Sequence, residues 1–367
     1  MTVPRAKPGR TGRRKWSFAV SAAAVLLSAA SDASAQTNPV TGGPLLPGFT
    51  DANTLQSAGN AQFGIGSNFL QRMARETTYG FANRDNSSGG GASQSTAEPL
   101  YRTWAETYGN SAHTAAQGTF VGDRRKAIGV VGGIGATIAP GFNIGFSADE
   151  SRTQIDVPLA LQSATLGMTQ GGCNASYVNG PWAVAMAAVH GFARISTQRA
   201  TALGSAYANY RGSIDGVLGE LSYSYSFGQS RIVPKVALEY ISARTDSYSE
   251  AGGAFPVSVA DSRGERARVL AGAEVGHYWI IGQQAVDVSA YGKFVDNFSQ
   301  NIGAVQVSLG NNAINVAGVR ESRTGADAGA AASWIYSNTV RFYTSYDGKF
   351  RDGFESHQGT LGVELKW

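Results

Sequence analysis

The chain has 367 residues, of which 15% are charged and 10% aromatic, with 47 glycines and a formal net charge of +4. Its one cysteine, Cys173, excludes a disulfide scaffold or a multi-cysteine metal site within a single chain. The abundance of glycine, Tyr and Phe favours β-structure, and no run of about 18 to 20 apolar residues follows residue 35, so a membrane span there would have to be a barrel.

Residues 1–35 have the features of a secretory signal peptide. A basic stretch from Arg5 to Lys15 precedes an apolar run from Phe18 to Ala30, and Ala33-Ser34-Ala35 suits the cleavage site. We expect Gln36 to be the first mature residue. Six of the 30 basic and one of the 26 acidic residues lie before it, so the mature chain carries 24 − 25 = −1. The charge therefore gives no reason to expect a nucleic-acid partner.

Residues 36–99 differ in composition from the rest. Prolines open the segment, Asp51 could cap a helix, and an apolar stripe of Phe63, Phe69, Leu70 and Met73 predicts a helix that ends near Tyr79. The stretch 83–98 contains Ser87-Ser88-Gly89-Gly90-Gly91 and predicts a flexible linker. We therefore expect a short passenger-like or plug segment tethered to the C-terminal part of the chain.

From about residue 100 onward the chain divides into segments whose side chains alternate over ten or more residues. In the clearest, Leu221 and Tyr223 alternate with Glu220 and Ser222, so one face suits lipid and the other a wet lumen. A tilted strand of this length can cross a bilayer. The pattern predicts an all-β, antiparallel up-and-down transmembrane barrel of about 12 strands: 100–109, 127–139, 142–153, 163–178, 182–197, 213–228, 231–245, 266–281, 284–297, 322–336, 339–350 and 357–367.

Tight turns such as Pro140-Gly141 and Asn179-Gly180 are expected to alternate with longer polar connections. The long connections are expected around 110–126, 154–162, 198–212, 246–265 and 298–321. Outer-membrane barrels have short periplasmic turns and long external loops, so the alternation predicts that topology. A soluble β-sandwich is the alternative, but it would need many short strands over a common core. Aromatic residues near segment ends would form the girdles: Trp182, Phe227, Tyr240, Trp279, Phe298, Trp334 and Trp367.

Inward parity gathers charged residues of both signs on the predicted lumen face. The candidates are Asp149, Glu220, Lys235, Glu239, Glu274, Asp287, Lys293, Arg341, Asp347, Glu364 and Lys366. They could form structural ion pairs around a plug, or line a pore whose charges select what passes. Glu220 and Glu239 are expected to lie nearly opposite each other, with Lys235 as the nearest cation.

The last segment alternates apolar with polar or small residues up to a terminal aromatic. Leu361, Val363, Leu365 and Trp367 share one face. This ending resembles the C-terminal strand of outer-membrane barrels, which implies that the barrel-assembly machinery reads it as an insertion signal. An ordinary half-buried last strand is the alternative.

Residues 100–367 as a whole resemble the translocator β-domain of bacterial autotransporters, the type V secretion family. The matching features are Trp104, the run 215–223, Pro234 followed by Leu238-Glu239-Tyr240, and Trp367. The resemblance implies a twelve-stranded barrel in the Gram-negative outer membrane, filled by a helix that continues into a passenger at the cell surface. Segment 53–79 would be that helix. The family's usual passenger has several hundred residues, whereas only about 64 residues separate the signal from the first strand.

Catalytic and cofactor chemistry find little support. Gly129, Gly132, Gly133 and Gly135 miss the dinucleotide-binding spacing and fit close packing in a strand better. The four histidines show no Ser/His/acid grouping and no metal-ligand spacing. We therefore expect no cofactor, no metal and no enzyme. The predicted function is an outer-membrane barrel, in contact with lipid, that anchors or translocates its own N-terminal segment; the alternatives are a porin-like channel and a surface protein that uses its loops for adhesion.

Overall fold

The computed structural model describes residues 52–82 and 101–367, except 119, 283, 311, 317 and 338. The predicted signal peptide and the Gly/Ser-rich linker lie outside the described residues. The elements are helix α2 (Ala52–Ala82), a 3-10 turn η2 (Pro158–Ala160), and strands β1 (Tyr101–Thr114), β2 (Asp123–Ala139), β3 (Phe142–Val157), β4 (Gln162–Asn179), β5 (Trp182–Thr201), β6 (Gly204–Tyr223), β7 (Tyr225–Phe227), β8 (Ser230–Thr245), β9 (Tyr248–Ser249), β10 (Ser258–Val259), β11 (Ser262–Ile281), β12 (Gln284–Ile302), β13 (Val305–Leu309), β14 (Asn312–Val316), β15 (Thr324–Ile335), β16 (Val340–Arg351) and β17 (Phe354–Lys366).

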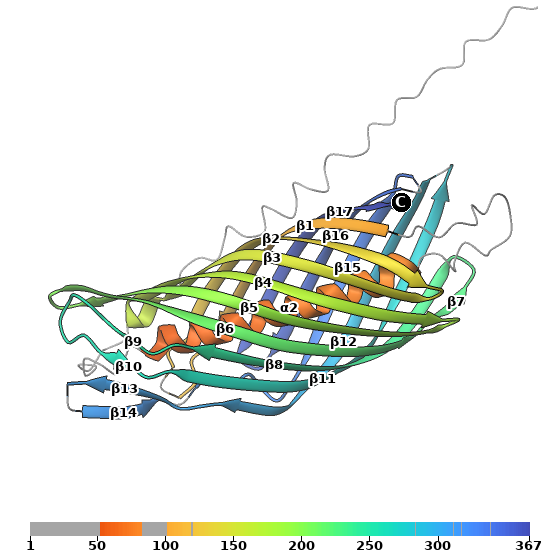
Figure 1. Ribbon diagram of the computed structural model, residues 1–367. Helices are drawn as coiled ribbons and strands as arrows, with labels where there is room; N and C mark the ends of the chain where they lie inside the picture. The colour runs from red at the N-terminus through yellow and green to blue at the C-terminus, as the bar shows by residue number, and fades with distance from the viewer. Residues whose placement is uncertain are drawn as a thin grey trace, which may run out of the picture. The chain divides into compact units, whose positions relative to one another are not determined.

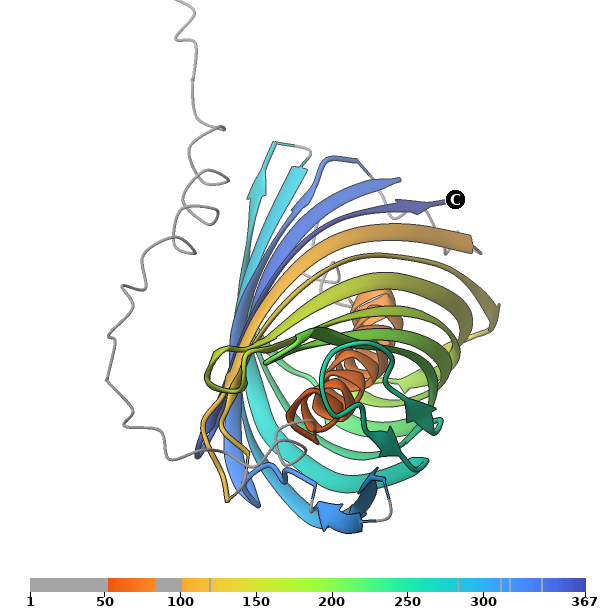
Figure 2. The same cartoon turned by 90° about the vertical axis from the view of Figure 1, so that its left-hand side faces the viewer.

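Twelve long antiparallel strands close into a barrel, which Figure 2 shows as a ring. Each pairs with its neighbour along the chain, β8 pairs with β11, and β17 pairs with β1. At this closing seam Tyr101 and Trp367 exchange two backbone hydrogen bonds, each 3.0 Å long. The predicted up-and-down barrel of about 12 strands is thus confirmed. The short strands β9, β10, β13 and β14 form a separate four-stranded sheet within the connections that follow β8 and β12.

The outward face carries an apolar band at the tight-turn end of the barrel. Val184, Leu221, Val236 and Leu238 are among its exposed apolar residues. Exposing so many apolar groups to water would be unfavourable, so this band is the surface for the hydrocarbon of the membrane. Exposed aromatic residues border it at the tight turns: Tyr101, Tyr177, Trp182, Tyr225, Phe227, Trp279, Trp334, Tyr336 and Trp367.

Beyond the band the strands continue, and the polarity of their two faces changes while each side chain keeps its inward or outward direction. Outward positions become polar there, including Glu150, Arg194 and Asp215, while several inward positions, including Ile195 and Ile214, are apolar and buried. The barrel wall therefore projects past the lipid into water at the end opposite the tight turns. A wall in water is expected to hydrate its outer face and bury its inner one.

This projecting wall corrects two predicted connections. Residues 198–212 are strand except for a two-residue turn, Ala202-Leu203, and only 158–161 join β3 to β4 in place of the predicted 154–162. Asp352-Gly353, between β16 and β17, is a two-residue turn at this end as well. The predicted alternation of short and long connections is therefore wrong. The long connections that remain span 115–122, 246–261 and 303–323.

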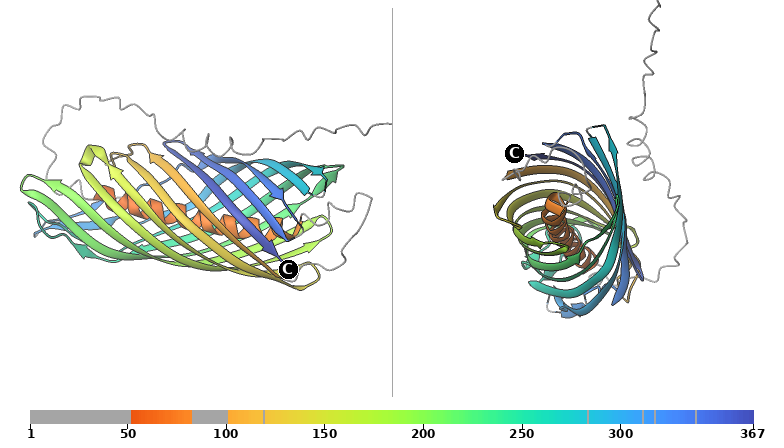
Figure 3. Two further views of the ribbon diagram at one scale, coloured as in Figure 1. Left: turned by 90° about the horizontal axis from the view of Figure 1, so that it is seen from above. Right: turned by 90° about the vertical axis from the view of Figure 1, so that its right-hand side faces the viewer.

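Helix α2 lies inside the barrel and runs along the lumen (Figures 1–3). Its first turn is at the projecting end, where Asn53 accepts a hydrogen bond from the backbone N–H of Val121 at 3.2 Å. Its last described side chain, Glu76, lies at the tight-turn end near Arg102 and Arg341, the second residues of β1 and β16. Among the described residues, no helix has the length and apolar character needed to cross a bilayer.

Candidate functional site

Helix α2 has one apolar and one polar face, and the lumen wall matches both. Phe69, Leu70 and Met73 are completely buried in a cluster with Leu166, Ile214 and other residues of β3 to β8. Glycines of the wall make room for these side chains: a Cβ added to Gly172 would lie 2.7 Å from Met73 Sδ, and one added to Gly216 would lie 2.9 Å from Leu70 Cδ1. Apolar packing therefore holds one side of the helix against this half of the barrel.

The polar face of the helix pairs with charges on the wall, beginning with Arg72. Its Nε lies 2.6 Å from Glu106 Oε2 and its Nη1 3.6 Å from Asp149 Oδ2, and its guanidinium stacks over the Tyr108 ring at 4.3 Å. The Tyr108 hydroxyl donates to Asp149 at 2.9 Å. A buried arginine needs this compensation because an unpaired charge in such a place is costly.

One turn further along, Glu76 joins a second charged group at the tight-turn end. Its carboxylate lies 3.7 Å from Arg102 and 3.4 Å from Arg341. Glu364 of β17 balances the same two arginines at 3.2 Å and 2.6 Å. The four side chains connect the helix to β1, β16 and β17, the strands at and beside the closing seam of the barrel.

Two further contacts join the helix to β8, β11 and β16. Glu239 accepts hydrogen bonds from Ser67 and Gln71 of the helix, at 3.0 Å and 3.3 Å, and forms an ion pair of 2.8 Å with Arg268 of β11. Arg75 pairs with Asp347 at 3.3 Å. Glu239 joins the helix to β8 and β11, whereas Asp347 joins it to β16, the strand that Glu76 also reaches through Arg341. Together these contacts define the rotation and the depth of the helix.

The charged candidates that the sequence places on the lumen face all point inward in the structure. Five of them contact the helix network, directly or through one partner: Asp149, Glu239, Arg341, Asp347 and Glu364. Lys366 lies 3.7 Å from Glu364. The others pair with each other on β6, β8, β11 and β12: Lys235 with Glu274 at 3.2 Å and Lys293 with Glu220 at 3.9 Å. Arg231 completes this wall group through Glu274 and Asp287.

The predicted juxtaposition of Glu220 and Glu239 is wrong. Glu220 pairs with Ala237 across the hairpin, and Glu239 pairs with Leu218. The turn consists of Gly228 and Gln229, so Phe227 lies opposite Ser230 and the two glutamates are offset by two residues. Gly228 adopts the left-handed φ of 61° that a tight hairpin needs. Lys235 forms an ion pair with Glu274 instead, and the cations beside Glu239 are Arg266 and Arg268.

Sequence reasoning missed Arg72, Arg102 and Glu106. The first strand is weakly patterned, so the alternation alone does not assign its inward parity. A usable signal is present in the next strand, where Gly129 and Gly133 face the rings of Tyr108 and Trp104; added Cβ atoms would lie 2.4 Å and 2.6 Å from them. The close packing expected for these glycines is therefore observed, and it identifies the face that Arg102 and Glu106 share.

Glu321 lies outside the strands of the barrel but interacts with its lumen. Burial would raise the pKa of this carboxyl, but Arg266, Arg268 and Arg351 more than offset that effect and lower the pKa to about 2. Its Oε1 lies 2.6 Å from Arg266 Nη1. The connection between β14 and β15 is thus attached to the inner wall by a charge that stays ionised at physiological pH.

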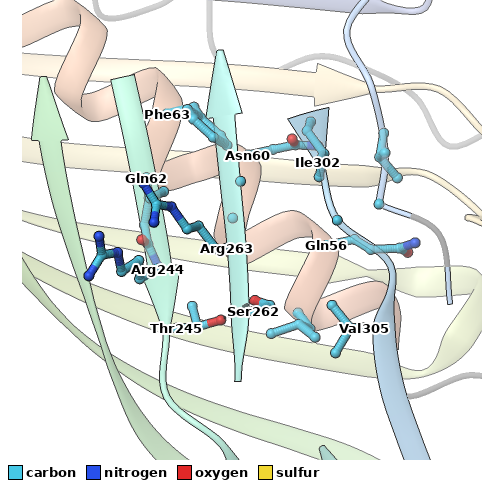
Figure 4. Close-up of a pocket in the computed structure, with 17 residues that line it drawn as sticks. Gln56, Asn60, Gln62, Phe63, Arg244, Thr245, Ser262, Arg263, Ile302 and Val305 are labelled. Atoms are coloured by element: carbon cyan, nitrogen blue, oxygen red, sulfur yellow. Dashed lines mark hydrogen bonds between the residues drawn. The ribbon is translucent and has the colours of Figure 1, made fainter. Parts of the chain in front are cut away.

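A cavity of about 460 Å³, including the part open to solvent, lies at the first turns of the helix. Figure 4 shows lining residues from α2, among them Gln56 and Phe63, together with Thr245 of β8, Ser262 of β11 and Val305 of β13. Its lining is mixed and contains no catalytic grouping. Elsewhere, the His190 Nδ1 to Asp215 Oδ1 distance is 2.7 Å, but both side chains are more than half exposed on the outward face. Within the described ranges, no cluster of three or more His, Cys, Asp or Glu could hold a metal.

These features define an outer-membrane β-barrel whose lumen is occupied by a helix from the same chain. The family model for the autotransporter β-domain matches residues 103–347, and the chain belongs to that family. Its place is accordingly the outer membrane of a Gram-negative cell. The resemblance stated from the sequence is confirmed.

Solved structures agree on the fold. The translocator domain of the autotransporter NalP from Neisseria meningitidis is similar with a TM-score of 0.64 and 15% identity, covering 87% of this chain and 99% of that one. The β-domain of the Bordetella autotransporter BrkA is similar with a TM-score of 0.57 and 16% identity, covering 73% of this chain and 100% of that one. No curated protein sequence matches the chain.

Proposed function

We propose that this translocator carries the segment before helix α2 to the cell surface and retains it there through the helix. The observation that carries the proposal is the direction of α2. Its N-terminal residues Asn53 and Thr54 contact Val121 and Gln162 at the projecting end, whereas Glu76 lies at the tight-turn end. In barrels of this kind the tight turns are periplasmic, so the residues preceding Ala52 would leave the lumen on the outside.

The contacts of the helix favour stable retention over transient passage. Arg72 and Glu76 are 1% and 4% exposed and both meet opposite charges. Sliding the helix outward by one turn would separate both from their partners, and removing one member of a buried ion pair costs about 3–5 kcal/mol. The helix thus serves as the anchor, and the barrel as its socket.

The test is an epitope tag inserted after Thr41, probed with antibody and protease on intact and then permeabilised cells. Detection on intact cells supports surface display. Two controls calibrate the assay: a tag between Ala202 and Leu203, in a turn of the projecting end, and a tag after Gly180, in a tight turn. The proposal is rejected when the Thr41 tag behaves like the Gly180 tag while the Leu203 control is accessible.

A second part of the proposal concerns assembly. Strand β17 forms the closing seam with β1, and its outward residues Leu361, Leu365 and Trp367 are 54%, 40% and 60% exposed. An exposed apolar stripe on the strand that must pair last suits recognition by the barrel-assembly machinery before closure. Val363 shares the same parity.

Replacing Trp367 by Ala tests this assembly role. We expect less folded barrel in the outer membrane, measured by heat-modifiable migration on gels of membrane fractions. Trp334→Ala is the matched control, because Trp334 is a similarly exposed aromatic of the tight-turn girdle on β15. Equal assembly of the two variants would refute a special role for Trp367.

A further inference from the structure

We propose that the lumen beside helix α2 contains a binding site for a small multivalent oxyanion, such as a phosphate-bearing or polycarboxylate solute. The site is a second cavity, distinct from the one at the first turns of the helix. It lies between the polar face of α2 and the wall formed by β1, β2, β3, β11, β16 and β17, and its volume is about 630 Å³ including the part open to solvent.

The helix contributes one continuous edge of this cavity. Asn60, Gly64 and Asn68 line it at intervals of four residues, which places them on one face of the helix. Asn110, Ser356 and Gln358 face them from the wall. The lining is thus rich in groups that can donate hydrogen bonds to an anion.

Cations outnumber carboxylates on the cavity surface. Among the described lining residues, four are cationic and one is acidic: Arg125, Arg266, Arg268, Lys349 and Glu321. Three of the cations have carboxylate partners: Arg125 lies 3.4 Å from Asp123, Arg268 lies 2.8 Å from Glu239, and Arg266 lies 2.6 Å from Glu321. The remaining cation, Lys349, sets the net charge of the lining.

Lys349 is held in place by neutral groups. Its ammonium donates to Asn68 Oδ1, and the Asn68 amide donates in turn to Gln358 Oε1 at 2.9 Å. Within the described part of the chain, no carboxylate lies within 4.0 Å of its Nζ. An ammonium has three N–H donors, and a buried positive charge of this kind is stabilised by an anion.

Five buried polar atoms of the described lining residues have no hydrogen-bond partner: Thr153 Oγ1, the Nε atoms of Arg125, Arg266 and Arg268, and Glu321 Oε2. Four of the five are donors, and Thr153 and Arg266 are only 2% and 4% exposed. Buried donors are rarely left without partners, and an oxyanion would accept from both a guanidinium and a hydroxyl. These donors, independently of Lys349, indicate a ligand rich in oxygen and negative charge.

The position of the cavity selects the source of the anion. Its lining on β1 runs from Tyr108 through Asn110 to Ala112, toward the projecting end. Tyr108 also belongs to the charged group of Arg72, Glu106 and Asp149, which borders the cavity on the side of the tight turns. The cavity faces the lumen, not the lipid. A dissolved anion that enters from outside is therefore the occupant, and a lipid headgroup is not.

The experiment is isothermal titration of the mature chain, folded in detergent, with inorganic phosphate and separately with citrate. We expect saturable binding with one site per chain. Lys349→Met should weaken binding about tenfold or more, because a hydrogen bond to a charged group is worth about 1.5–3 kcal/mol. Glu321→Gln should tighten it, because the substitution removes the lining carboxylate.

Lys293→Met is the matched control, since Lys293 is a lumen lysine paired with Glu220 and is not part of the lining. It should bind phosphate like the wild type. Heat-modifiable migration confirms that each variant is folded before titration. The proposal is overturned when the wild type shows no saturable heat with either anion, or when the two lysine variants lose affinity equally.

Discussion

Arg72 of helix α2 and Glu106 of strand β1 form an ion pair of 2.6 Å, with side chains that are 1% and 3% exposed. Glu106 lies on the strand that closes the barrel against β17, so the pair connects the helix to the seam. Arg72→Met would leave Glu106 and Asp149 without this cation. We expect a loss of about 3–5 kcal/mol in the free energy of unfolding, measured by denaturant titration in detergent.

A double-mutant cycle separates the pair from its surroundings. Glu106→Gln alone should also destabilise the barrel, because it strands the guanidinium of Arg72 beside one remaining carboxylate, Asp149, at 3.6 Å. The double variant should lose less than the sum of the two single variants. Additive losses would show that the charges do not interact.

Gly172 of β4 gives a prediction about packing between helix and wall. An added Cβ would lie 2.6 Å from the backbone oxygen of Ala188 and 2.7 Å from the end of the Met73 side chain. Gly172→Ala should therefore cost about 1–3 kcal/mol through overpacking. Gly167→Ala on the same strand, where nothing lies within 4 Å of the new Cβ, should be neutral in the same unfolding assay. Equal stability of both variants would contradict the close contact.

Glu321 predicts a dependence of stability on pH. Its pKa in the folded protein is about 2, below the ordinary value of 4.5, so the unfolded chain binds the proton more readily. The stabilisation is fully present above pH 4.5 and is lost as the pH falls through 2. Glu321→Gln should lower the free energy of unfolding by about 3 kcal/mol at neutral pH.

The measurement for Glu321 compares wild type and variant at a series of pH values. The difference between them should shrink steadily from about pH 4.5 downward. Because both proteins contain every other titrating group, the difference isolates this carboxyl. A constant difference down to about pH 2 would mean that the charge of Glu321 contributes nothing.

The membrane-spanning half of the fold is predictable because apolar and polar side chains alternate residue by residue along its strands. Leu221 and Tyr223 face outward while Glu220 and Ser222 face inward, and lipid on one side with water-like polarity on the other produces that pattern. The projecting half resembles loops in the sequence because its alternation runs in the opposite phase. Ala206 and Ala208 are inward and Tyr207 and Asn209 outward, so the segment has no outward apolar stripe to mark it as a strand.

The candidate site is only partly predictable, for reasons of register. Parity alone puts Glu239 and Lys235 on the inner face, but their partners depend on which residue lies opposite, and one residue more or less in a turn changes that pairing. Some contacts between α2 and the wall join residues more than a hundred positions apart, such as Ser67 and Glu239. No pattern of neighbouring residues in the sequence indicates which of these distant residues come into contact.

The apolar band predicts where a charge is most costly. Val236 lies near the middle of the outward stretch of β8 that starts at the tight turn, and it is 43% exposed to the surroundings of the barrel. Val236→Lys should reduce the free energy of folding into lipid vesicles by about 2–4 kcal/mol, because lysine at the bilayer midplane loses its hydration. Gln198→Lys is the control: Gln198 is exposed on the projecting part of β5, where the new ammonium stays in water, and a cost near zero is expected. Refolding titrations into vesicles measure both. A similar cost at the two positions would mean that the lipid boundary does not lie where the phase of alternation inverts.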